Sequence, residues 1–332
     1  MEKEELIVKI KELQIKLKEH PINKCPIKKS NGIVKKQHYV WKHYLDSWSN
    51  NSQLCAYLKE SKKNILTNSI NVAQERFFNK MNKLGELEIE FLEKICAEIK
   101  GPIKPTIDSI LEDAKIFNKF KNIIEKIKPH DNIPSAEELE KNGFEYLHTI
   151  IENDGKDLIK FKTKSDLDFF EDDQFKYKTL IFICFQYFRT KKKKEELLKS
   201  FSNSKLDAEK IFPILSIISA IILAQSISFT SDINYILLEI SNESSNEFIT
   251  SDQPVINLKG DERNSEGEVK DLSLYYPISP KIALLISFEK NIEKYTHNYL
   301  GNKEIEYYNK MIISKASNFV FASSHEIIQQ YL

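Results

Sequence analysis

FKYKTLIFICFQYF, residues 175–188, is apolar around its whole helical circumference and contains no glycine or proline. A helix that is hydrophobic on every side belongs at the centre of a protein, where other elements cover it. Arg189 follows directly, and a charged side chain at the end of a buried helix needs an acceptor. The stretch therefore predicts a multi-helix core built around residues 175–188.

Segments on both sides of this helix extend the prediction. Residues 84–99 and 106–127 repeat apolar side chains every three or four positions, as amphipathic helices do. Eight glycines and ten prolines in 332 residues leave few helix breakers. These features favour a mainly α protein.

The pattern changes after Asn234, where short apolar runs alternate with turn residues. We expect a hairpin at 54–58 and 64–66, further strands at 235–240, 247–249, 272–276 and 319–322, and helices at 280–287 and 305–315. Ser279 and Pro280 would begin the first of these two helices. The predicted fold is mainly α with a smaller α+β C-terminal portion, a multi-helix core plus a short mixed or antiparallel sheet.

The N-terminal segment differs from the rest. Residues 2–19 place Leu6, Ile10, Leu13 and Leu17 on one narrow helical seam, and a lysine-rich stretch follows. We interpret residues 1–36 as an amphipathic docking helix and basic connector, which packs either on its own core or in a homodimer. Residues 37–332 then form a single core domain, helical over 37–231 and α+β over 232–332.

Composition indicates where the protein acts and which partners it does not attract by charge. Lysine plus arginine and aspartate plus glutamate are equal at 49 each, so no net charge draws the chain to nucleic acid or membrane. The four cysteines are dispersed, and the first residues do not form a secretory signal, which predicts reduced thiols and a cytoplasmic location. Residues 211–231 carry no charge and could span a bilayer, but Pro213 and several polar residues within them favour a buried core helix. We expect no stable membrane association.

No strong nucleotide-binding or metalloprotease motif is present, and the seven histidines are too scattered to suggest a zinc site. We predict no metal and no cofactor. Three polar clusters remain. His38 could be a general base or a core histidine, Arg189 a phosphate clamp or the partner of a carboxylate, and Asp252 a catalytic carboxylate or the cap of a turn.

The segments that carry these clusters also carry a resemblance. They read QHYV with YL (37–40, 44–45), QYFRT (186–190), FITSDQPV (248–255) and YPISP (276–280), with Asn309 before ASNFVFAS (316–323). In this order they resemble the bacterial family known as domain of unknown function 4238. Trp41 departs from the family's usual proline, and a lysine follows Thr190. The resemblance implies a protein of unassigned activity, with a role in defence against phage as one expectation.

The resemblance brings polar residues from distant segments into one pattern, which packing alone does not require. Our first hypothesis is a metal-independent nuclease acting as a toxin, with His38, Arg189 and Asp252 as catalytic residues. Five residues would contact its substrate: Gln37, Tyr39, Gln186, Ser251 and Asn309. RNA is the expected substrate because its 2′-hydroxyl supplies a nucleophile. The alternative is a non-catalytic sensor or binding module that recognises a phage component or a small ligand.

Overall fold

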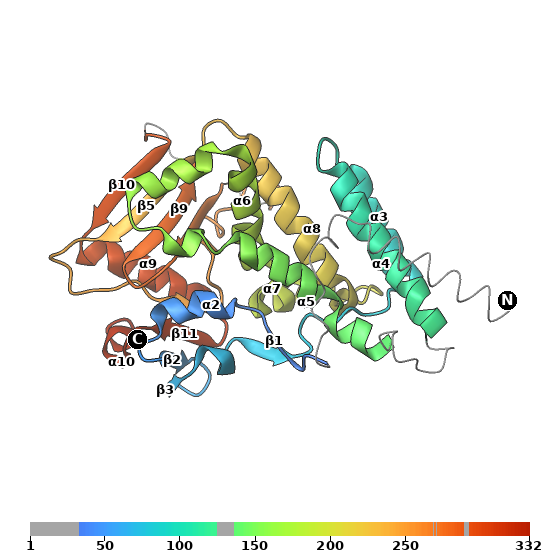
Figure 1. Ribbon diagram of the computed structural model, residues 1–332, viewed down its shortest axis with the longest axis horizontal. Helices are drawn as coiled ribbons and strands as arrows, with labels where there is room; N and C mark the ends of the chain where they lie inside the picture. The colour runs from blue at the N-terminus through green and yellow to red at the C-terminus, as the bar shows by residue number, and fades with distance from the viewer. Residues whose placement is uncertain (1–32, 125–135, 268, 270, 289–291) are drawn as a thin grey trace.

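The computed structural model describes residues 33–124, 136–267, 269, 271–288 and 292–332 (Figure 1). The helices are α2 (Lys42–Leu45), α3 (Glu86–Glu98), α4 (Lys104–Ile124), α5 (Ala136–Asp154), α6 (Asp173–Phe188), α7 (Lys191–Ser200), α8 (Ala208–Phe229), α9 (Asn302–Lys315) and α10 (His325–Gln329). The strands are β1 (Lys36–His38), β2 (Leu54–Leu58), β3 (Lys63–Thr67), β4 (Gln74–Arg76), β5 (Asn234–Ile240), β6 (Thr250–Ser251), β7 (Ile256–Asn257), β8 (Ser273–Pro277), β9 (Ile282–Ser287), β10 (Tyr295–Leu300) and β11 (Phe319–Ala322). The predicted docking helix, residues 2–19, lies outside the described residues.

Helix α6 lies at the centre of the core, as its all-round apolar sequence predicts. It begins at Asp172, whose carboxylate accepts hydrogen bonds from the backbone N–H groups of Gln174 and Phe175. Its most extensive packing is against α8, and Leu180, Phe182 and Phe185 are completely buried. Figure 1 shows α6 and α8 side by side, between the five-stranded sheet and the helices α3 and α4.

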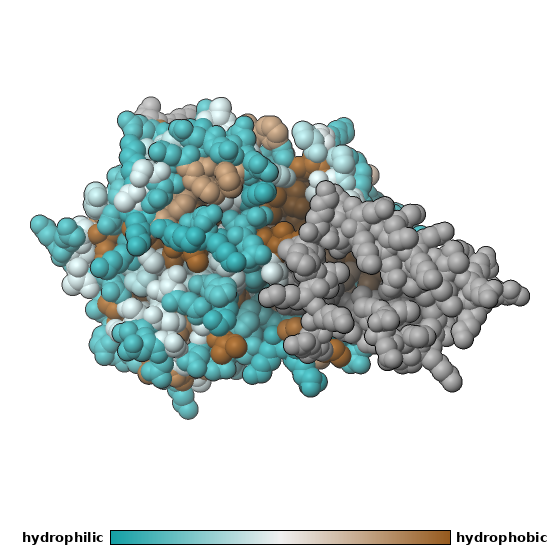
Figure 2. All heavy atoms as spheres, viewed as in Figure 1, coloured by the Kyte–Doolittle hydropathy of each residue, from teal (hydrophilic) through white to brown (hydrophobic). Residues whose placement is uncertain are grey.

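Helix α8 contains the charge-free run. By length and composition alone it could cross a membrane, but 61% of its apolar window is buried inside the protein. Asp207 caps its first turn, and Pro213 lies in the next, near the helix start. In this structure α8 serves as a core helix. Figure 2 shows the described part of one face covered mainly by hydrophilic residues, with hydrophobic side chains in small groups.

Strands make up more of the chain than we predicted. A five-stranded mixed sheet has the order β10-β5-β9-β8-β7, in which only β10 and β5 run parallel. A four-stranded antiparallel sheet has the order β3-β2-β11-β6, and β1 pairs with β4 in a third sheet. The fold is therefore α+β, and the prediction of a mainly α protein with one short sheet is wrong. The prediction missed β1, β4, β7 and β10, because the first three are only two or three residues long and local patterns do not reveal which distant segment a strand pairs with.

Two further predictions need correction. Residues 282–287 form strand β9 at the centre of the five-stranded sheet, not a helix, and every one of them is buried. The hydroxyl of Ser279 accepts hydrogen bonds from the N–H groups of Lys281 and Ile282, so it stabilises a hairpin turn instead of beginning a helix. Residues 37–48 contain the end of β1, the short helix α2 and a 3₁₀ turn at Asp46–Trp48.

Other predicted elements are confirmed. The hairpin of β2 and β3 pairs Leu54 with Thr67 and Leu58 with Lys63. Helix α9 and strand β11 occupy the expected positions. Because β11 lies between β2 and β6, the four-stranded sheet brings the segment after β1 next to the segment that contains Asp252. The same sheet thereby joins strands from the N-terminal and the C-terminal parts of the described chain.

Candidate functional site

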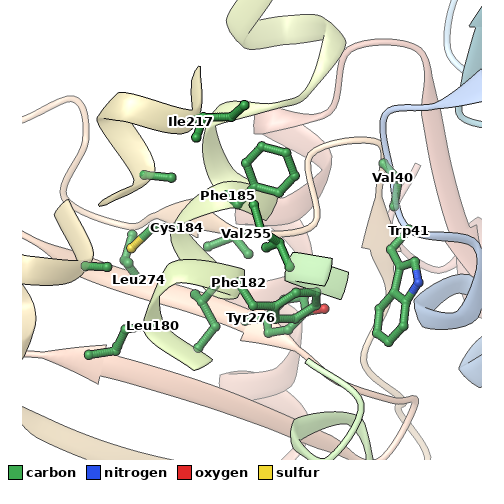
Figure 3. Close-up of a cluster of buried hydrophobic side chains, with 14 of the residues drawn as sticks. Val40, Trp41, Leu180, Phe182, Cys184, Phe185, Ile217, Val255, Leu274 and Tyr276 are labelled. Atoms are coloured by element: carbon green, nitrogen blue, oxygen red, sulfur yellow. The ribbon is translucent and has the colours of Figure 1, made fainter. Parts of the chain in front are cut away.

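Several of the predicted site residues lie at the ends of elements that meet around the last turn of α6, whereas Asn309 lies within α9. Gln37 and His38 belong to β1, and Tyr39 follows it. Gln186 is in the last turn of α6, and Arg189 is its C-cap residue. Figure 3 shows Phe182 and Phe185 of α6 near Val255 and Tyr276, with Val40 and Trp41 on the neighbouring segment after β1. Three segments far apart in sequence are therefore packed together here.

Arg189 holds two of these segments in place. Its side chain is 2% exposed, and its Nε and Nη2 atoms donate to the backbone carbonyl oxygens of Tyr39 and His38, each at 3.3 Å. Nη2 also lies 2.7 Å from Oε1 of Glu152 on α5. The guanidinium stands over the ring of Phe185, 5.1 Å from its centroid. Most of its hydrogen-bonding capacity is thus used within the protein.

Asp252 has a comparable structural role. One carboxylate oxygen accepts from the N–H of Ser317 at 2.8 Å, and the other accepts from Asn318 at 2.6 Å and Phe319 at 3.1 Å. Burial raises the pKa of this carboxyl, while the three N–H donors act in the opposite direction. Asp252 therefore orients the chain that enters β11, and its oxygens face backbone donors.

The other predicted binding residues also join distant segments. Nε2 of Gln37 donates to the carbonyl of Lys141, and its Oε1 accepts from the N–H of Asn79. Asn309 accepts from the N–H of Ile249 and donates to the carbonyl of Glu247. The four side chains Gln37, Arg189, Asp252 and Asn309 each satisfy backbone groups that the sheets and helices leave unpaired.

Ser251 makes a local turn contact. Its hydroxyl accepts from the N–H of Gln253 and donates to the carbonyl oxygen of the same residue. The Gln253 side chain in turn accepts a hydrogen bond from the hydroxyl of Thr190, and donates to the carbonyls of Tyr187 and Val255. This pair links the end of α6 to the turn that holds Asp252.

His38 differs from these residues because one of its ring nitrogens has no partner. Its Nδ1 is buried and makes no hydrogen bond among the described residues. Burial lowers the pKa of His38 to about 4, and the positive charges of Arg189 and Lys42 act in the same direction. The imidazole is therefore neutral at neutral pH and keeps a lone pair for an incoming hydrogen-bond donor.

Three more buried polar groups lack partners near the end of α6. Both amide atoms of Gln186, Nη1 of Arg189 and the hydroxyl of Tyr276 make no hydrogen bond among the described residues. Gln186 and Arg189 are three residues apart on one helical face. The Tyr276 ring lies 6.3 Å from Phe182, one turn before Gln186. Because buried polar groups in proteins are almost always paired, these atoms and His38 are the candidates for contact with water or ligand.

A surface pocket adjoins this cluster. It has a volume of about 370 Å³ and is lined by Lys35, Lys36, Gln74, Glu75 and Arg76. The antiparallel register pairs Lys36 with Arg76 and His38 with Gln74. Directly paired residues, and residues two apart, share a face of a β-ribbon. His38 therefore lies on the same face as Lys36 and Arg76, beside the pocket.

The pocket strand has an unusual backbone at both ends. Ala73 and Phe77, the residues before and after β4, have φ values of 49° and 57°. Residues with side chains seldom adopt this left-handed conformation, and it occurs preferentially at functional sites. The carbonyl of Ala73 accepts from the N–H groups of Tyr39 and Val40, which ties β4 to the segment after His38.

The pocket residues had no recognisable signal in the sequence. Lys35 and Lys36 belonged to the predicted connector, and Arg76 stands in a segment without a motif. Glu152, the partner of Arg189, is one of many acidic residues on an amphipathic helix. Within the described parts of the chain, no three histidine, cysteine, aspartate or glutamate side chains are grouped so that they could hold a metal ion.

The fold and the site define an α+β protein with a buried polar cluster beside a cationic pocket. A family model with the description "Protein of unknown function (DUF4238)" matches residues 36–326, and the chain belongs to that family. The resemblance based on the motif segments is confirmed. Comparison with curated proteins and with solved structures found no match.

Proposed function

We propose that this protein is a binding module that recognises a phosphate-bearing ligand in the pocket between β1 and β4. One observation carries the proposal: Lys35, Lys36 and Arg76 line a pocket of about 370 Å³ on the same β-ribbon as His38, whose Nδ1 has no partner among the described residues. Cationic side chains on a concave surface favour anions, and guanidinium groups suit phosphate geometry. From the family resemblance we further propose that the protein acts in the bacterial cytoplasm, in defence against phage.

Thermal unfolding of the full chain tests this proposal. Inorganic phosphate, added at constant ionic strength, should raise the unfolding midpoint, because a ligand that binds only the folded state stabilises it. Arg76→Ser and Lys36→Ala should reduce this rise. Lys63→Ala is the matched control, since Lys63 is an exposed lysine on β3 and lies outside the pocket lining. A midpoint that responds to neither phosphate nor pyrophosphate would contradict the proposal.

RNA cleavage is the second candidate, and the neutral imidazole of His38 favours it. In this reaction Nδ1 of His38 takes the proton of an RNA 2′-hydroxyl, and the 2′-oxygen forms a bond to phosphorus. The bond from phosphorus to the 5′-oxygen breaks, and the leaving oxygen takes a proton from solvent. Arg189, through its free Nη1, would stabilise the charge on the phosphate, while Asp252 holds the neighbouring turn.

Expression in bacteria separates this candidate from binding alone. The nuclease candidate predicts growth arrest with RNA fragments that end in 2′,3′-cyclic phosphate, and loss of both effects in His38→Ala. Cleavage by the purified protein should persist in a metal chelator. Equal growth arrest by the wild type and His38→Ala, or arrest with intact RNA, would remove the nuclease candidate and leave the binding module.

Dimerisation through residues 2–19 is a separate proposal. The narrow apolar seam of Leu6, Ile10, Leu13 and Leu17 suits a partner helix from a second copy. Solution mass before and after removal of residues 1–20 tests it. A monomer in both cases would exclude the dimer.

A further inference from the structure

The pocket contains more positive charge than its own acidic residue can balance. Within the described residues, Lys35, Lys36 and Arg76 have no carboxylate at ion-pair distance. The single acidic lining residue, Glu75, is already paired with Lys191 of α7. The Arg76 guanidinium packs on the ring of Phe77, 5.1 Å from its centroid. Three cationic residues thus line this pocket, and none of them is paired with a carboxylate among the described residues.

Unlike the cations of the pocket, the nearby lysines are paired within the protein. Lys193 and Lys194 of α7 form ion pairs with Glu196 and Glu209. Lys80 and Lys141 likewise pair with Glu140 and Glu137. Nζ of Lys192 donates to the carbonyl of Lys315. The lysine-rich run at 191–194 is therefore largely neutralised within the protein.

This contrast distinguishes a small ligand from a polymer. A protein that binds single-stranded RNA places a basic groove along the backbone, so that successive phosphates meet successive cations. Among the described residues, the lysine-rich run at 191–194 of α7 and the pair Lys80 and Lys141 are already occupied within the protein. Three cations within about 370 Å³ instead match a compact group with several negative charges.

We propose that the ligand of this pocket is a small molecule with a diphosphate group, held by Lys35, Lys36 and Arg76, and not polymeric RNA. This inference rests on the proposed binding function and specifies its ligand class. The two phosphates would supply at least two negative charges to the three cations. His38, on the same face of the β-ribbon, would accept a hydrogen bond from the remainder of the ligand.

Calorimetric titration of the full chain tests the ligand class. The probes are pyrophosphate, adenosine 5′-diphosphate, and a ten-nucleotide single-stranded RNA with hydroxyl groups at both ends. We expect both diphosphates to bind at least roughly tenfold more tightly than the RNA, and Arg76→Ser or Lys36→Ala to weaken them roughly tenfold. Lys63→Ala should bind as the wild type does. Circular dichroism of each variant shows whether the fold is retained, and Lys36→Glu provides a second, charge-reversing variant.

Each other outcome overturns the inference, but in different ways. RNA that binds as tightly as the diphosphates, with the same loss in Arg76→Ser, overturns the ligand class and leaves the phosphate-binding function intact. Diphosphate binding that both pocket variants retain places the site elsewhere and refutes both proposals. Absence of binding by all three probes also refutes both.

Discussion

The guanidinium of Arg189 and the carboxylate of Glu152 meet at 2.7 Å, Nη2 to Oε1, although one ends α6 and the other lies on α5. The same guanidinium nitrogen donates to the carbonyl of His38 on β1. One nearly buried side chain therefore joins two helices and the strand that borders the pocket. Loss of this side chain would affect both stability and the position of His38.

Arg189→Met should lower the free energy of unfolding by about 3–5 kcal/mol, because it leaves Glu152 without its partner in a largely buried position. Arg189→Met combined with Glu152→Met should cost less than the sum of the two single changes. Denaturant unfolding of the single and double variants measures this coupling. Lys310→Met is the control, since Lys310 pairs with Glu306 on the surface and should cost less than about 1 kcal/mol. Strictly additive effects would contradict the coupling.

Gln37 and Gln186 offer a comparison within one residue type. Both are almost completely buried, but Gln37 has two backbone partners and the Gln186 amide has none among the described residues. Gln37→Leu should destabilise the protein by about 2–3 kcal/mol, because the N–H of Asn79 and the carbonyl of Lys141 lose their partners. Gln186→Leu should change stability by less than about 1 kcal/mol. Urea unfolding of both variants measures these two free energies. Equal losses of stability would mean that the Gln186 amide is hydrogen-bonded to internal water.

Tyr44 and Tyr276 provide a second comparison, because their rings stack with centroids 5.0 Å apart. The Tyr44 hydroxyl contacts the Thr250 hydroxyl at 2.5 Å and donates to the Pro277 carbonyl at 2.7 Å, while the Tyr276 hydroxyl has no partner among the described residues. Tyr44→Phe should cost about 1–2 kcal/mol, and Tyr276→Phe less than about 0.5 kcal/mol. Thermal unfolding measures both. A larger loss of stability for Tyr276→Phe than for Tyr44→Phe would show that the Tyr276 hydroxyl is the one that makes the stabilising hydrogen bonds.

Asp252→Ala should lower the free energy of unfolding by about 3 kcal/mol or more, since three backbone N–H groups at the start of β11 lose a charged acceptor together. Asp172→Ala removes only the cap of α6 and should cost about 1 kcal/mol. Chemical denaturation compares the two variants. If Asp252→Ala folded with normal stability, its carboxylate would have to act on a ligand instead of the backbone.

Acid should weaken the fold partly through His148, which is buried, and His38, which is half-buried. The pKa of His38 is lowered to about 4 by burial, and burial also lowers the pKa of His148 well below its ordinary value near 6.5. Above pH 6.5 both histidines are neutral in the folded and unfolded states. Between pH 6.5 and 4 the unfolded chain binds protons that the folded protein does not, so the free energy of unfolding falls as the pH falls.

Unfolding free energy measured from pH 7.5 to 4.5 tests this slope. Each histidine contributes up to about 1.4 kcal/mol per pH unit in this window. His38→Asn and His148→Phe should each make the slope shallower, whatever their effect at pH 7.5. The measurement ends at pH 4.5 because Asp46 and Asp166, whose pKa values are lowered, lose their stabilising charge at still lower pH. If the slope were unchanged in both variants, the pH dependence would not come from His38 and His148.

The sequence predicted those elements whose signal is local. The all-apolar run at 175–188 indicated α6, and the segment at 305–315 indicated most of α9, because a repeated pattern over several turns reports which faces are buried. Residues 282–287 show no such repeated pattern. Six consecutive buried residues have no periodicity, so the strand β9 could not be distinguished from a helix until its neighbours β5 and β8 were known.

By itself, the sequence determined the central helix, the family and the segments that carry polar side chains, since residue type and spacing suffice for these. Only the tertiary structure decided how each polar side chain is used. It paired Gln37, Arg189, Asp252 and Asn309 with backbone groups and brought Arg76 opposite Lys36. Among the described residues it left Nδ1 of His38 and the amide of Gln186 without partners. Hydrogen bonds and charge pairing depend on distances between residues far apart in the chain, and such distances arise only when the sheets and helices pack.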